Sequence, residues 1–336
     1  MTPHHLCDLL IRIGTQVRAC VHNSLVQQTH EERSSIVEES ADDTIYQIDR
    51  HVEAFIVPTL EEQSERLGGI ILIAEGISEQ GMTLPHGWSE DEAKWRIIID
   101  PIDGTRGIMY DKRSAFFLAG AAPNRGAETS LQHIEIAVMV ELPTTRSYLS
   151  DILWAIRGQG AKRISQNLLN GDETEHPITP SKASTIYGGF AQIARFFPPG
   201  REILAAIDEE LCATLFPDAP MGRAFLFEDQ YISTGGQLYE LLLGHDRFIA
   251  DIRHSLSRRL IREGRTPGLI CHPYDICSWL IGAEAGLHIT SVNGSPLDTP
   301  LDTTSPVDWI AYANASIRQE VEPVLQKILR KHGLLD

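Results

Sequence analysis

The sequence predicts a mixed protein of the α+β or α/β class, and three patterns support this prediction. Apolar residues recur at helical spacing over residues 5–27. Short apolar segments at 70–74 and 96–99 are typical of buried strands. In the second half of the chain, strand-like and helix-like segments alternate, which is an α/β pattern. With 336 residues, of which 42% are hydrophobic, the chain can form one large or two ordinary domains with a proper core.

In the first half we expect two helices followed by a sheet. The first helix covers residues 5–27, and the second covers 45–67 and is broken near Pro58. After the two strands named above, three further apolar segments predict a meandering sheet, namely 116–122, 134–142 and 152–156.

A composition shift predicts the division into domains. Residues 162–182 are rich in Asn, Ser, Thr, Glu and Pro, so we expect an N-terminal domain (1–165) and a C-terminal domain (180–336). The C-terminal segments expected to form strands or helices are 185–190, 201–212, 236–243, 247–250, 275–285 and 308–313.

Charge and cysteine usage exclude some partners. A net charge of −17 argues against nucleic acid or an anionic membrane as the main partner. No apolar stretch approaches the roughly 18 residues of a membrane span, and no secretory signal pattern is present. An odd number of cysteines without CxxC spacing predicts free thiols and a cytoplasmic location. The cysteines are Cys7, Cys20, Cys212, Cys271 and Cys277.

The strongest functional signal lies at residues 95–105, which read Trp-Arg-Ile-Ile-Ile-Asp-Pro-Ile-Asp-Gly-Thr. We expect a buried strand at 97–99 that delivers Asp100 and Asp103 on a tight turn forced by Pro101. Two carboxylates on one turn repel each other unless a cation lies between them, and hard divalent cations such as Mg²⁺ take oxygen ligands of this kind. The alternative is an ordinary turn with a helix cap, since Asp-Pro and Asp-Gly pairs are common there.

Gly104 and Thr105 then suit the start of a helix, whose free backbone N–H groups favour a phosphate. A metal and a phosphate on one segment together indicate phosphoryl chemistry.

The run 100–105 resembles the signature of the inositol monophosphatase superfamily. Its members are Mg²⁺-dependent, lithium-sensitive phosphatases of small phosphorylated metabolites, and include inositol monophosphatases, fructose-1,6-bisphosphatases and 3′(2′),5′-bisphosphate nucleotidases. Further segments match the family in the same order along the chain, namely 45–49 with Glu53, 70–75, 157–161, 233–236, 274–275 and 284–286. The resemblance implies a layered αβαβα sandwich with the active site where the two halves meet, and a homodimer.

The resemblance also implies a role for each candidate residue. Two or three Mg²⁺ ions would bind to Glu75, Asp100, the Ile102 carbonyl, Asp103 and Asp275. The attacking water would be oriented by Glu75, Thr105 and Asp49. The substrate would contact Asp103, Gly104, Thr105, Gly235, Gly236 and Asp251. We also expect Asp275 to be the N-cap of a helix at 276–285.

Three features of the chain bear on the number of metals or on the substrate. Gly76 stands where the family often has a second glutamate, which leaves open whether two or three metals bind. Arg106 and Gly107 are more similar to the continuation found in bisphosphate nucleotidases. The arginine-rich segment 253–265 either contacts a second phosphate or is a solvated surface paired with acids elsewhere.

These observations predict a Mg²⁺-dependent phosphomonoester hydrolase of a small metabolite such as an inositol or sugar phosphate. One alternative is a 3′(2′),5′-bisphosphate nucleotidase or a fructose-1,6-bisphosphatase-like activity. The alternative of another class is a catalytically weak, metabolite-binding or regulatory relative, for which Gly76 is the support.

Overall fold

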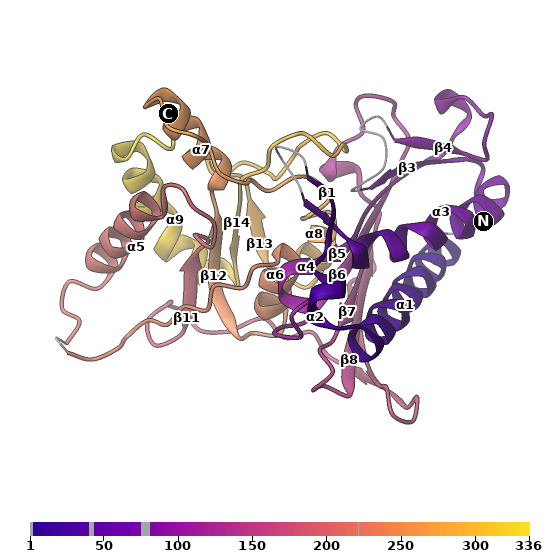
Figure 1. The fold of residues 1–336 in the computed structure, drawn as a ribbon. Helices are drawn as coiled ribbons and strands as arrows, with labels where there is room; N and C mark the ends of the chain where they lie inside the picture. The colour runs from indigo at the N-terminus through magenta and orange to yellow at the C-terminus, as the bar shows by residue number, and fades with distance from the viewer. Residues whose placement is uncertain (1–2, 40–43, 75–80, 221) are drawn as a thin grey trace.

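The computed structural model describes residues 3–39, 44–74, 81–220 and 222–336, with the side chains at 30, 36–39 and 44–54 outside the description. Five layers lie side by side: a helix pair, the larger sheet, a second helix pair, the smaller sheet and a third helix pair (Figure 1). The predicted αβαβα sandwich is confirmed.

The larger sheet has eight described strands and is mostly antiparallel; only β3 and β5 pair in parallel among them. In sheet order, the strands are β10 (Glu173–His176), β9 (Ala161–Asn167), β8 (Leu149–Ile156), β7 (Ile136–Leu142), β6 (Ala115–Pro123), β5 (Trp95–Asp103), β3 (Ile70–Ala74) and β4 (Met82–Leu84). The predicted strands of the first half are therefore confirmed.

The smaller sheet belongs to the second half of the chain. Its described strands, in order, are β11 (Phe190–Ile193), β12 (Asp246–Asp251), β14 (Trp309–Tyr312) and β13 (His288–Thr290). Strands β11 and β12 are parallel, whereas β14 runs antiparallel to both of its neighbours. A separate pair of strands, β1 (Ile36–Glu39) and β2 (Thr44–Tyr46), precedes the long helix α3.

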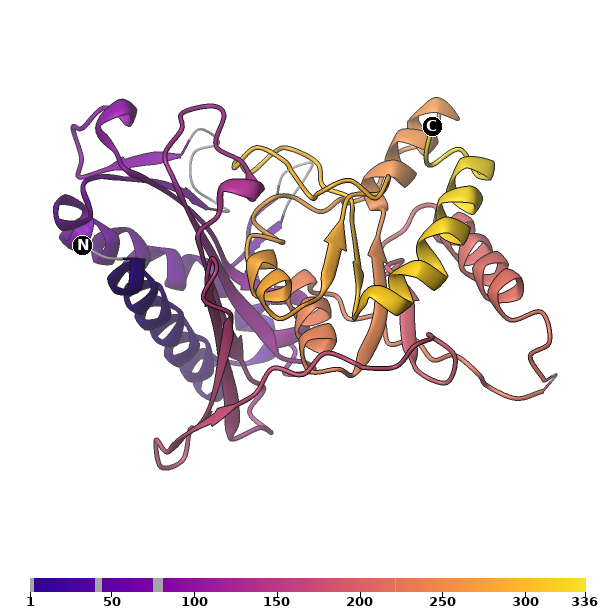
Figure 2. The ribbon, with the colours of Figure 1, turned by 180° about the vertical axis from the view of Figure 1, so that it is seen from behind.

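Three helix pairs cover the sheets (Figures 1 and 2). The outer face of the larger sheet packs against α1 (Pro3–Gln27) and α3 (Gln47–Leu67), and α6 (Thr234–Leu242) and α8 (Trp279–Glu284) lie between the sheets. The far face of the smaller sheet packs against α5 (Arg201–Leu215) and α9 (Ala315–Lys331). The remaining helices are α2 (His30–Arg33), α4 (Thr105–Ile108), α7 (Arg253–Arg262) and the 3-10 turns η1 (Glu90–Glu92) and η2 (Leu131–His133).

Two apolar cores follow from strand alternation, because successive side chains of a strand point to opposite faces. Ile97 and Ile99 of β5 pack in the core under α1 and α3, whereas Ile98 packs in the core shared by the two sheets. The shared core joins residues of both halves, such as Phe116 and Phe248. Among the described residues, no helix is both long and apolar enough to cross a bilayer.

Some element predictions were wrong. Pro58 does not break α3, which runs on to Leu67 because its packing against α1 and β5 holds it in place. Residues 185–189 are not a strand, since β11 begins at Phe190. Strands β9 and β10 extend the larger sheet through the segment predicted as the boundary, and the division into two domains there remains a prediction.

Candidate active site

Asp100 and Asp103 lie at the end of β5, which is buried along nearly its whole length. In a regular strand, residues three apart would point to opposite faces of the sheet. The register of β5 against β6 shifts between these two aspartates: Asp100 pairs with Leu118 and Asp103 pairs with Phe116. One extra residue in β5 forms a bulge, which brings both carboxylates to the same side.

This bulge corrects the prediction of a turn after the strand. Pro101 lies within the bulge, where its missing N–H removes no ladder hydrogen bond that the sheet needs. The strand continues to Asp103. Bulges of this kind re-aim side chains, and here the result is a pair of acids on the same side of the strand.

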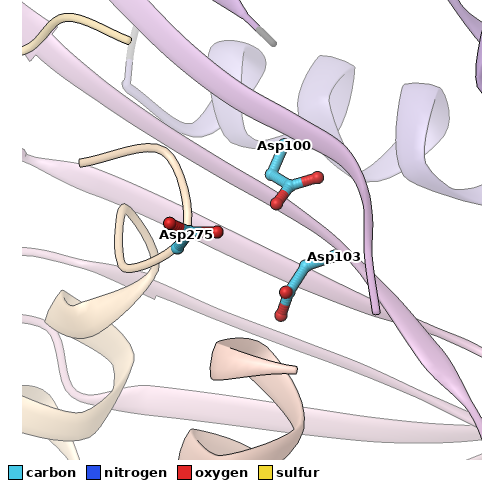
Figure 3. A group of neighbouring side chains, drawn as sticks. All are labelled: Asp100, Asp103 and Asp275. Carbon is cyan, nitrogen blue, oxygen red and sulfur yellow. The ribbon is translucent and has the colours of Figure 1, made fainter. Parts of the chain in front are cut away.

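Asp275 reaches these two aspartates from the second half of the chain. One carboxylate oxygen from each of Asp100, Asp103 and Asp275 lies within 4.8 Å of the others. Figure 3 shows the three side chains gathered together, two from β5 and one from the turn before α8. The prediction that Asp275 is the N-cap of that helix is wrong, because α8 begins at Trp279 with Ser278 as its N-cap.

Burial and mutual repulsion act on the carboxylates of the cluster. Burial raises the pKa of Asp103, and the neighbouring carboxylate of Asp275 raises it further. Burial also raises the pKa of Asp275, although the His272 N–H and the nearby Arg253 act in the opposite direction. Three carboxylates this close together offer only oxygen atoms as metal ligands, which suits a hard divalent cation.

Asp103 is held by the N-terminus of α6. Its carboxylate accepts hydrogen bonds from Ser233 Oγ at 2.8 Å, from Thr234 N at 3.3 Å and from the Gly235 N–H. Ser233 is also the N-cap of α6, since its Oγ accepts from Gly236 N at 2.8 Å. The two glycines predicted to contact the substrate therefore donate their N–H groups to other residues of the site, Gly235 to Asp103 and Gly236 to Ser233. Direct contact of these glycines with a substrate remains a prediction.

Gly235 has no room for a side chain. A Cβ at this position would lie 2.9 Å from Asp103 Oδ2 and 2.8 Å from Leu118 Cδ2. Helix α6 can thus approach the acidic cluster closely only because residue 235 is glycine.

The segment after the bulge reverses the chain. Gly104 has φ of 96°, in the left-handed region that favours glycine, and is the N-cap of the short helix α4. Thr105 Oγ1 donates to the Ile102 carbonyl at 2.7 Å. These two predicted site groups therefore contact each other directly.

Two predicted residues lie outside this description. Glu75 belongs to the segment 75–80, which is outside the described residues. The backbone of Asp49 is part of α3, but its side chain is also outside the description. Their roles as metal ligand and water-orienting residues remain predictions.

Asp251, the predicted contact for a substrate hydroxyl, is fully buried at the end of β12. Its two carboxylate oxygens accept from Arg253 Nε at 2.8 and 3.0 Å and from Arg253 Nη2 at 2.6 Å. Arg253 in turn lies over the Phe196 ring, 4.7 Å from its centroid. The structure thus places Asp251 in a buried ion pair.

Most arginines of the segment 253–265 bind to the protein itself. Arg259 pairs with Glu263 at 2.7 Å, Arg265 pairs with Glu202 at 2.7 Å, and Arg262 donates to the Gly333 carbonyl. Of these three side chains, only Arg265 pairs with an acid elsewhere in the chain, as the interpretation of a solvated surface expects; Arg259 pairs within the segment and Arg262 binds a backbone carbonyl.

Sequence reasoning missed two neighbours of the cluster. The His272 N–H donates to Asp275 Oδ2 at 2.6 Å and fixes that carboxylate. The Cys277 side chain is buried, and burial together with Asp100, Asp275 and Asp103 raises the pKa of its thiol, so it stays neutral. A backbone donor leaves no signal in the sequence, and a cysteine outside any motif gives none either.

Known proteins resemble this chain in sequence and in fold. The profile of the inositol monophosphatase family matches residues 4–114, which include Asp100 and Asp103. Among solved structures, the Leishmania major fructose-1,6-bisphosphatase superposes with a TM-score of 0.67 at 15% identity, covering 98% of this chain and 96% of that chain. The resemblance to the inositol monophosphatase family is confirmed.

Two further structures have the same inositol monophosphatase-type fold. The suhB protein of Bartonella henselae has a TM-score of 0.63 at 15% identity, covering 96% of this chain and 99% of that chain. A staphylococcal IMPase complexed with products has a TM-score of 0.62 at 15% identity, covering 99% and 98% of the two chains. A search of curated protein sequences gives no significant match.

Proposed function

We propose that the chain is a metal-dependent phosphomonoester hydrolase that acts on a small phosphorylated metabolite such as an inositol or sugar phosphate. The family match and the fold indicate a phosphatase. The observation that carries the proposal is the convergence of Asp100, Asp103 and Asp275 within 4.8 Å, from both halves of the chain. The match to the family profile ends at residue 114, so the observation that Asp275 joins the cluster comes from the fold.

The donor set supports Mg²⁺ as the cofactor. Asp100, Asp103 and Asp275 would hold the first ions, with Glu75 and the Ile102 carbonyl as further ligands, and two or three ions would bind in total. When bound, such ions supply Lewis-acid stabilisation of a phosphoryl group and a water acidic enough to react near neutral pH.

The protein's own contribution is to fix these oxygens before a substrate arrives. Three donors from the start of α6 hold Asp103, and the His272 N–H holds Asp275. Because these contacts are already made, little reorganisation is needed when the substrate binds, which favours catalysis. In the same proposal Thr105, Glu75 and Asp49 orient the attacking water, and Gly104 and Thr105 contact the phosphate.

Release of inorganic phosphate from a substrate panel tests the proposal. The panel contains inositol monophosphates, sugar monophosphates, fructose 1,6-bisphosphate and 3′,5′-bisphosphorylated nucleosides, assayed with Mg²⁺, with EDTA and with Li⁺. We expect Mg²⁺-dependent turnover of at least one compound, inhibited by Li⁺ and lost in Asp275→Asn. Turnover that survives EDTA would contradict the proposal, and tight binding of a metabolite without turnover would favour the catalytically weak relative.

The same resemblance supports a homodimer in the cytoplasm. All five cysteines are free, which agrees with the reducing location that we propose. Light scattering coupled to size exclusion measures the oligomeric state, and a monomer at micromolar concentration would refute that part.

A further inference from the structure

A cavity of about 510 Å³ lies between α7, the segment that follows it and the loop at Pro306. Its polar lining includes the side chains of His254, Arg258 and His272 together with Ser257. None of the described residues that line it is acidic. In a chain of net charge −17, a cavity without acids and with three basic side chains is unusual.

The three basic groups are close enough to influence one another. Burial lowers the pKa of His254, and the neighbouring Arg258 and His272 lower it further. Groups that repel one another in this way gain stability when an anion lies between them.

The acids around the cavity already have partners. Asp308 accepts from the N–H groups of His254 and Ser255 and from Ser255 Oγ. Asp251 is paired with Arg253, as described above. Neither carboxylate lines the cavity.

Arg258 differs from the other arginines of its segment. Its ion pair with Asp336 spans 3.7 Å, and the two side chains are 53% and 88% exposed. An exposed pair at this distance is weak. Arg262, one turn further along α7, instead donates to the Gly333 carbonyl, at the end of α7 that lies beside the C-terminus (Figure 1).

We propose that this cavity binds an anionic group, a phosphate or a carboxylate, through Arg258 and His254. The turn that carries His272 also holds Asp275, so the cavity and the acidic cluster share one short segment. The anionic group belongs either to the substrate, as a second charged group, or to a separate small anion. The first of these sources rests on the proposed function, whereas binding itself does not.

Isothermal titration calorimetry with inorganic phosphate tests the proposal. The full chain is used after its metal has been removed with EDTA. We expect saturable binding that Arg258→Gln weakens about tenfold or more, as loss of a charge-assisted hydrogen bond implies. Arg262→Gln is the matched control on the same helix and leaves the affinity unchanged. No saturable binding up to about 20 mM phosphate, or equal affinity in wild type and Arg258→Gln, would overturn the proposal.

Steady-state kinetics with Mg²⁺ then separates the two sources. An increase of KM in Arg258→Gln that is confined to substrates with a second anionic group assigns the cavity to the substrate. An unchanged KM for every substrate, with phosphate affinity lost, assigns it to a separate anion. If the chain hydrolyses none of the panel, the proposed function fails, and the calorimetric result still decides whether the cavity binds anions.

Discussion

Gly235→Ala tests whether α6 positions the Asp103 carboxylate, because this substitution should lower turnover much more than it lowers the stability of the fold. The added Cβ would lie 2.9 Å from Asp103 Oδ2, whereas ordinary contacts begin near 3.4 Å. The carboxylate must therefore retreat by about half an ångström, which is the tolerance within which functional sites must be held. Since larger displacements of about 1 Å cost about 100-fold in rate, we expect turnover to fall 10- to 100-fold.

The effect on stability should be small. Overpacking costs about 1–3 kcal/mol, and alanine in a helix regains up to about 1 kcal/mol relative to glycine. Phosphate release with Mg²⁺ and thermal unfolding are measured together for Gly235→Ala and for Gly107→Ala. The latter is the control, because its Cβ would meet no atom closer than 3.7 Å. Equal activity of Gly235→Ala and wild type would refute the claim that α6 sets the position of Asp103.

Three other substitutions have defined outcomes. Asp103→Asn should reduce turnover by about 100-fold or more, since even outer-shell metal partners contribute 10- to 100-fold; near-normal phosphate release would exclude Asp103 as a ligand. Asp251→Asn leaves Arg253 buried without its partner, so urea denaturation should show a loss of about 3–5 kcal/mol, and a loss below about 1 kcal/mol would contradict the pair's importance. Burial raises the pKa of Asp246 to about 7 from 3.8, so the folded chain binds more protons than the unfolded chain between these values and becomes less stable as pH rises through them. Asp246→Asn should therefore be more stable than wild type by about 1 kcal/mol or more at pH 8, with a smaller gain at pH 5; a gain independent of pH would disprove this.

The two long helices and five of the strands in the first half followed from the sequence because they depend on local periodicity, whereas the short strands β1, β2 and β4 and the edge strands β9 and β10 were not predicted. The apolar residues predicted for α1 at helical spacing are all buried, as are the strands at 70–74 and 97–99. Pro58 shows where local preference fails, since packing against α1 and β5 outweighs the proline.

The acidic cluster could be predicted only in part. The spacing of Asp100 and Asp103 identifies two acids that belong together, but the bulge that places them on one face depends on the register with β6. Asp275 is 172 positions beyond Asp103 in the chain, so periodicity cannot bring them together and only the family resemblance did.

The distant partners of the arginine-rich segment could not be predicted, although the Arg259–Glu263 pair follows from i,i+4 spacing. Arg265 pairs with Glu202, and Arg262 with the Gly333 carbonyl, which lie 63 and 71 positions away. Such pairs depend on how α7 packs beside the chain's end, and no local pattern encodes that arrangement.

Anomalous diffraction from crystals soaked in Mn²⁺ tests the central claim most directly, because it locates the ion without depending on a substrate. The account predicts a peak within about 2.6 Å of carboxylate oxygens from Asp100, Asp103 and Asp275 together. A map with no peak at these residues, or with a peak bound only by groups from one half of the chain, would contradict it.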